Sequence, residues 1–169
     1  PIVWNYHHLE GDFNERWQSW WFIKQFDAIT TVSEATKKEI LLKYAPDPQR
    51  VHVIPNGVDS KFIPHQPDRS ILTKWGIEGK KILLHVGALI ARKNLLFLLE
   101  VVRHVVRSRP DVVLVLCGEE FSTRKEYTGR LRKRVRDLGL HDIVIFTGKV
   151  SEDEKLQWYN LCDVFVFPS

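Results

Sequence analysis

Short apolar runs alternate with segments of helical periodicity from residue 80 to the end of the chain, and this alternation limits most strongly which folds the chain can adopt. The runs are KKILLHVG, DVVLVLCG, DIVIFTG and DVFVF. Strands that alternate with helices of this length predict a parallel sheet covered on both faces. We therefore expect an α/β fold with a doubly wound parallel sheet. In the first helical segment, the residues that share the apolar face are Leu95, Leu98, Leu99, Val102, Val105 and Val106.

Polar residues in the two later helical segments, near residues 130–138 and 151–161, are explained by helix capping and solvent exposure. Ser151 to Glu154 forms a capping box, which explains the acidic triplet at residues 152–154 better than a metal site does. In the segment before it, Leu131, Val135 and Leu138 form a buried stripe, so the cations around them are expected to face solvent. Contact of that cationic face with an anionic membrane or nucleic acid is the alternative. The cations are Arg130, Arg132, Lys133, Arg134 and Arg136.

A shorter version of the same strand and helix pattern occupies residues 1–59. It includes an aromatic-rich helix expected from Phe13 to Phe26 and a helix with Ser33 as its N-cap. Two crossovers do not make a complete doubly wound domain. We therefore expect residues 1–59 to be the tail of one α/β domain, residues 60–79 to be a hinge or linker, and residues 80–169 to be a truncated second domain.

Composition narrows the class of protein further. With 44% apolar and 27% charged residues, the chain has the composition of a globular domain, and its excess of 25 basic over 21 acidic residues gives a net charge of +4 that favours anionic partners. No long apolar span, secretion signal or metal-binding cluster is visible, and Cys117 and Cys162 are expected to be buried, reduced thiols. A cytoplasmic location follows, with peripheral membrane contact as an option. Methionine is absent and the chain stops after an expected strand, so we expect a fragment of a larger fold.

Candidate binding residues lie at the ends of the expected strands. Gly87, Gly118 and Gly148 each end a strand, where backbone can approach a ligand closely. Arg92 and Lys93 follow the first of these glycines, directly before Asn94, the expected N-cap of the next helix. Two cations at the N-terminus of a helix are unfavourable, because that end of the helix dipole is positive. A diphosphate bound between them would supply negative charge and make the arrangement favourable. By spacing alone, two solvated loop cations are an equal alternative.

The order and spacing of VHVIPNGVD, HVGALIARKNLLFLLEVV, LVLCG and IVIFTGKVSEDEKLQWYNLCDVFVFPS resemble glycosyltransferase family 4, of GT-B architecture. The resemblance covers essentially the whole chain. It implies two Rossmann-like domains, a nucleotide-sugar donor linked to UDP or GDP, retention of anomeric configuration, and no cofactor or metal. It also implies an acceptor that is a glycan or a lipid-linked molecule. The glutamates of the family's E-x7-E motif would follow Ser169, so we expect the 169 residues alone to be inactive.

The resemblance assigns roles to individual residues. Lys93 matches the lysine that contacts the donor diphosphate, and Gly87 matches the glycine of the same motif. The family motif has an arginine at the position where this chain has Ala88, and Arg92 is the candidate to replace that arginine. His7 matches a cleft histidine near the transferred sugar, although a histidine that merely ends a strand is the alternative. The residues expected to border the nucleobase are Gly118, Gly148, Lys149 and Val150.

Two other functions compete with sugar transfer. A GT-B sugar-nucleotide epimerase would need additional carboxylates for proton transfer, and none lies at the strand ends. A nucleotide-sugar-binding domain without catalysis is the other alternative, and the alanine at position 88 keeps it open. Binding of nucleic acid is not expected, because the aromatic and basic clusters lie in different segments.

Overall fold

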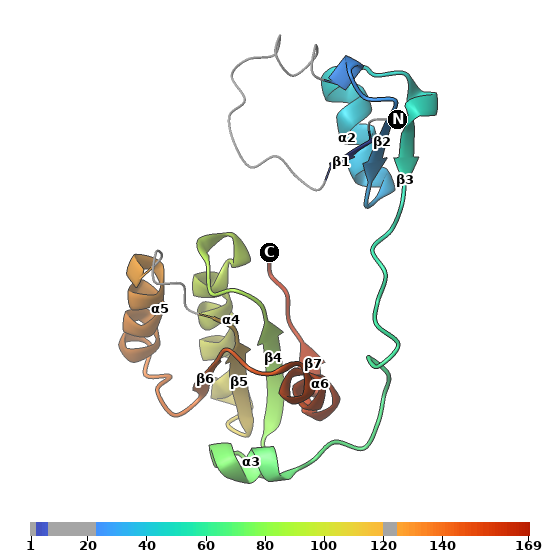
Figure 1. The fold of residues 1–169 in the computed structure, drawn as a ribbon. Helices are drawn as coiled ribbons and strands as arrows, with labels where there is room; N and C mark the ends of the chain where they lie inside the picture. Colours follow the sequence, from blue (N-terminus) through green and yellow to red (C-terminus); the bar gives the residue numbers. More distant parts are fainter. Residues whose placement is uncertain (1–2, 7–22, 120–124) are drawn as a thin grey trace. The chain divides into compact units, whose positions relative to one another are not determined.

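The computed structural model describes residues 3–6, 23–119 and 125–169. It divides into two compact units, Pro1–Lys61 and Phe62–Ser169, each of which is described by itself. Both units contain parallel sheets with helices packed on them (Figure 1). The predicted α/β fold is confirmed.

The first unit contains a three-stranded parallel sheet with strand order β1-β2-β3. Ser33 caps α2 as predicted, because its hydroxyl oxygen accepts a hydrogen bond from the Thr36 N–H at 3.2 Å. Most of the helix expected from Phe13 to Phe26 lies outside the described residues. Within the part of that range that the structure describes, Ile23 and Lys24 are helical. The elements are β1 (Val3–Tyr6), β2 (Ala28–Thr31), α2 (Glu34–Tyr44), the 3₁₀ helix η1 (Pro48–Arg50) and β3 (Val51–Val53). The buried apolar core consists of Ile23, Ile29, Ile40, Tyr44 and Val51.

The second unit is built on a four-stranded parallel sheet with strand order β6-β5-β4-β7. The chain runs outward from β4 through β5 to β6 and then returns to pair β7 with the other edge of β4. The strand order therefore reverses between β4 and β7, which makes that boundary a topological switch point. The strands are β4 (Lys81–Val86), β5 (Val112–Cys117), β6 (Val144–Gly148) and β7 (Val164–Phe165). The helices are α3 (Ser70–Trp75), the 3₁₀ helix η2 (Ala91–Lys93), α4 (Leu95–Ser108), α5 (Lys125–Asp137) and α6 (Glu152–Leu161).

Apolar residues bury both faces of the second sheet. One face packs against α4 and α5, and the other packs against α3 and α6. Strand β5 is buried along its whole length, as a central parallel strand covered on both faces should be. The predicted apolar stripes supply the core on the α4 and α5 side, including Leu95, Leu98, Leu99, Val102, Leu131 and Val135.

The structure differs from the expected linker at residues 70–77. Residues 70–76 form α3 and its C-cap, and Ile71, Leu72 and Ile77 are buried in the core of the second unit. A six-residue helix is too short to show the apolar periodicity that would distinguish it from a linker.

The two cysteines differ in their environments. Cys117 is a free thiol buried in β5, and burial raises its pKa to about 11. The expectation of burial is wrong for Cys162, which is partly exposed at the end of α6, where its thiol donates to the Tyr159 carbonyl at 3.3 Å. At the helix C-cap, where the chain turns toward β7, Cys162 packs against the core with only part of its surface buried.

Candidate functional site

The three strand-end glycines lie next to one another at the carboxyl edge of the second sheet. The Gly87 N–H donates to the Cys117 carbonyl at 2.9 Å, and the Gly118 N–H donates to the Gly148 carbonyl at 3.1 Å. A Cβ atom at Gly118 would lie 1.8 Å from the Gly87 carbonyl oxygen, so only glycine fits there. These contacts hold the ends of β4, β5 and β6 together at one edge of the sheet.

Lys93 extends from η2 to the switch point between β4 and β7. Its Nζ atom lies 4.0 Å from the ring centroid of Phe167, which follows β7. A cation over an aromatic face is attracted by the negative charge at that face. Figure 1 shows the chain leaving β4 and β7 at the same end of the sheet. Lys93 therefore stands where ligands bind in open parallel α/β sheets, outside the carboxyl ends of the strands.

Two positive charges lie close together beside the switch point. Partial burial and the neighbouring charge of Arg92 both lower the pKa of the Lys93 ammonium. Arg92 is exposed beside it on η2, at the entrance to α4. An anion bound between these two cations would favour the charged form of Lys93 again. It would also interact favourably with the positive, N-terminal end of the helix dipole. The arrangement can bind an anionic, bidentate ligand such as a diphosphate.

The N-terminus of α4 does not follow the expected capping scheme. Asn94 occupies the N-cap position, but its backbone is left-handed, with φ at 51°, and its side chain makes no capping hydrogen bond. Asparagine tolerates this conformation better than most residues. The turn through η2 requires it, because the Lys93 and Asn94 N–H groups bond back to the Ile90 and Ala91 carbonyls.

The loop after β6 contributes mainly backbone. Gly148 has a positive φ of 72°, and Lys149 is exposed, with its ammonium 3.8 Å from the Glu119 carboxylate. The side chain of Val150 packs against the core on the α6 side. His7 lies outside the described residues, and the structure therefore brings together the other candidates without it.

Sequence analysis missed two residues at this edge. Phe167 lies beneath Lys93, and His85 stacks on Phe167 with 5.8 Å between ring centroids. A histidine inside an otherwise apolar strand was the available signal for His85. Phe167 could not be found from sequence, because its position depends on the non-local pairing of β7 with β4.

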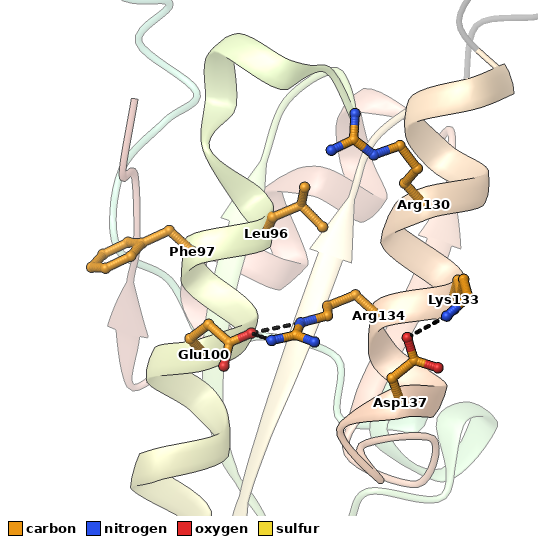
Figure 2. A pocket seen from close by; sticks show the side chains of 7 residues that line it. All are labelled: Leu96, Phe97, Glu100, Arg130, Lys133, Arg134 and Asp137. Atoms are coloured by element: carbon orange, nitrogen blue, oxygen red, sulfur yellow. Dashed lines mark hydrogen bonds and ion pairs between the residues drawn. The ribbon is translucent and has the colours of Figure 1, made fainter.

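An open groove of about 400 Å³ lies elsewhere, between the outer faces of α4 and α5 (Figure 2). Two internal ion pairs occupy it: Arg134 Nε donates to Glu100 at 2.6 Å and Lys133 Nζ donates to Asp137 at 2.7 Å. None of the candidate site residues lines it. The cations of α5 are largely solvent-exposed, in agreement with the predicted solvated face.

Acidic residues of the second unit are used in local structure. Ser151 caps α6 as predicted, with its hydroxyl accepting from the Glu154 N–H at 3.0 Å. Glu152 pairs with Lys155, and Glu154 pairs with Lys74.

Within residues 3–6, 23–119 and 125–169, no cluster of three or more histidine, cysteine or acidic residues could hold a metal ion. In the same residues, no helix has the length and hydropathy needed to span a membrane.

The family described as glycosyl transferases group 1 matches residues 68–169, more than half of the chain, and glycosyltransferase family 4 matches residues 1–62. The chain belongs to the group 1 glycosyltransferases of family 4, and the predicted family is thereby confirmed.

Individual relatives agree with this membership. A putative glycosyltransferase, YtcC, from Bacillus subtilis is 30% identical over 149 residues, covering 83% of this chain and 37% of YtcC. Mannosylfructose-phosphate synthase from Agrobacterium fabrum is 29% identical over 168 residues, covering 95% of this chain and 37% of that enzyme. The crystal structure of Anabaena HepE in complex with UDP-glucose matches with a TM-score of 0.85 at 19% identity, covering 99% of this chain and 46% of HepE. The chain thus spans 37–46% of the length of these relatives.

Proposed function

We propose that this chain provides the donor-binding part of a retaining glycosyltransferase that moves a sugar from a nucleotide-sugar donor to a glycan or lipid-linked acceptor. The observation that carries the proposal is the position of Lys93 at the switch point of a sheet whose glycine-rich strand ends lie alongside it. Family membership and the UDP-glucose bound to the similar HepE support a sugar nucleotide as the anion.

Each candidate residue has a proposed role in donor binding. Lys93 and Arg92 bind the diphosphate, and Gly87 lets it approach the end of β4. Gly118 and the backbone of residues 148–150 border the nucleobase. His7 contacts the transferred sugar.

The proposed reaction proceeds on one face of the sugar. The bond from the anomeric carbon to the diphosphate oxygen breaks while an acceptor hydroxyl oxygen bonds to the same face of that carbon. The hydroxyl proton passes to the departing diphosphate oxygen. Negative charge grows on the diphosphate as the bond breaks, so the two cations stabilise the transition state more than the ground state. A lipid-linked acceptor would place this reaction at the cytoplasmic surface of a membrane.

A panel of nucleotide sugars tests the proposed activity. We expect one UDP- or GDP-linked sugar to be transferred or hydrolysed by the chain extended to the length of its relatives, and we expect the 169 residues alone to bind it without turnover. Proton NMR of the first-formed product should show the anomeric configuration of the donor. Inversion would contradict the retaining mechanism, and binding without turnover in the extended chain would favour a non-catalytic domain.

Arg92 is proposed to replace the family arginine that is absent at Ala88. We expect Arg92→Ala to weaken UDP-glucose binding about threefold, because an ion pair between an exposed cation and the diphosphate contributes roughly 0.2–1 kcal/mol. Adding Ala88→Arg to that variant should restore the lost affinity. Isothermal titration calorimetry of the single and double variants measures both effects, and a double variant no tighter than Arg92→Ala would contradict the replacement.

A further inference from the structure

His85 is a fully buried histidine in the middle of an apolar strand. Its relative exposure is 0%, and it lies on the same face of β4 as Leu83, which packs against the α4 core. Burying a polar ring is unfavourable unless its nitrogen atoms have hydrogen-bond partners. One of the two nitrogen atoms of His85 has such a partner and the other does not.

The hydrogen bond of Nδ1 defines the protonation of the ring. Nδ1 lies 3.1 Å from the Val166 carbonyl oxygen. Because a carbonyl oxygen only accepts, Nδ1 must carry a proton, and in the neutral ring Nε2 is then an acceptor. Nε2 is buried and has no hydrogen-bond partner among the residues that the structure describes.

Nε2 points toward the residues of the candidate donor site. The position that a Cβ atom would take at Gly87 lies 3.5 Å from Nε2 of His85 and 3.9 Å from Cε of Lys93. The His85 ring also stacks on Phe167 with an interplanar angle of 20°. Phe167 therefore touches both His85 and the ammonium of Lys93. Because position 87 is glycine, no side chain at that position separates the imidazole from the lysine.

The charges around His85 oppose its protonation. Burial lowers the pKa of His85, the Val166 carbonyl partly raises it, and the charge of Lys93 lowers it further. The positive charge of Arg92 acts on Lys93, and Glu119, after β5, is paired with Lys149. Helix α4 presents leucines to this face, β7 presents Val166 and Phe167, and the thiol of Cys117 on β5 packs into the opposite core. A bound diphosphate would add negative charge beside Lys93, which would raise the pKa of His85 and favour its protonated form.

We propose that His85 is a positioning residue of the donor site: it holds Phe167 beneath Lys93, and its Nε2 takes up a proton from solvent when an anionic diphosphate binds at Lys93. The inference rests on the proposed function, since it requires that a diphosphate binds there. Linkage then requires the diphosphate to bind more tightly as the pH falls through the range in which His85 titrates. A side chain that served only to fill the core would give no such dependence.

UDP-glucose is the appropriate probe, because its diphosphate is esterified at both ends and does not itself titrate near neutral pH. We expect its Kd to be at least about threefold lower at about pH 5.5 than at about pH 7.5. NMR of the histidine side chains should show His85 titrating at a pH about one unit higher with UDP-glucose than without it. This titration of the unmodified protein does not depend on any variant folding.

Two variants separate His85 from other histidines. His85→Asn keeps an amide donor for the Val166 carbonyl but has no group that titrates in this range, so UDP-glucose affinity should lose most of its dependence on pH. His104→Asn, at an exposed position on α4, should retain the dependence of the unmodified protein. Binding of equal strength at both pH values, with the His85 titration unmoved, would overturn the inference and leave the proposed function intact. Failure of UDP-glucose and other nucleotide sugars to bind at either pH would overturn both.

Discussion

Lys93→Ala is expected to weaken binding of UDP-glucose at least tenfold, which corresponds to about 1.4 kcal/mol. The ammonium that the variant removes lies at the switch point, where partial burial and the charge of Arg92 make it an unfavourable cation until an anion binds. Lys93 is partly buried whereas Arg92 is exposed, so solvent screens the charge of Lys93 less and its loss should exceed the effect of removing Arg92. Isothermal titration calorimetry of the 169-residue chain measures the change.

Lys133→Ala is the matched control for that substitution. Lys133 is also a lysine of the second unit, but it lies in the groove between α4 and α5 and is paired with Asp137. The same charge is removed from the chain, so any general electrostatic effect is reproduced. The control should bind UDP-glucose within about twofold of the unmodified chain. Equal losses in the two variants would mean that net charge, and not the position of Lys93, governs binding.

Gly118→Ala is expected to destabilise the second unit by about 1–3 kcal/mol. The added Cβ would lie 1.8 Å from the Gly87 carbonyl oxygen and 2.8 Å from its carbonyl carbon, so backbone must move. Because that movement separates the ends of β4 and β5, UDP-glucose affinity should fall as well. Urea denaturation measures the free energy of unfolding, and amide hydrogen exchange in β5 assigns the loss to the second unit.

Gly129→Ala is the control for this steric effect. Gly129 lies within α5, and a Cβ atom there would have nothing within 4 Å. Alanine is the better helix former, so this variant should stabilise the unit by about 0.5–1 kcal/mol. A Gly118→Ala protein as stable as the unmodified chain would show that the two strand ends are not in close contact.

Local features of the fold were predictable because their causes lie within a few residues. Ser33 and Ser151 both cap helices as expected, since each hydroxyl accepts an N–H three residues later in the chain. The buried stripe of α4 follows from its apolar spacing, and Leu95, Leu99 and Val102 are fully buried. The same argument fails for α3, which is too short to establish a period.

The candidate site was predictable only in part, because it depends on which strands pair. The sequence places Gly87, Gly118 and Gly148 at strand ends, and parallel pairing brings them to one edge. It does not reveal that β7 returns to β4, which brings Phe167 beneath Lys93 and the Val166 carbonyl to His85. Non-local pairing of this kind leaves no periodic trace in the residues involved.

Asn94 shows a second limit of sequence reasoning. Its residue type and position are typical of an N-cap, yet it adopts a left-handed backbone and makes no capping bond. The hydrogen bonds of η2 determine the conformation there, and they depend on how the chain leaves β4.

The central claim is that a nucleotide-sugar diphosphate binds at the carboxyl edge of the second sheet, between β4 and β7. Amide chemical-shift mapping of the 169-residue chain with UDP-glucose tests it most directly. We expect the largest changes at Gly87, at Arg92 and Lys93, at Gly118 and at residues 148–150. Changes confined to the groove between α4 and α5, or no change with millimolar ligand, would contradict the claim.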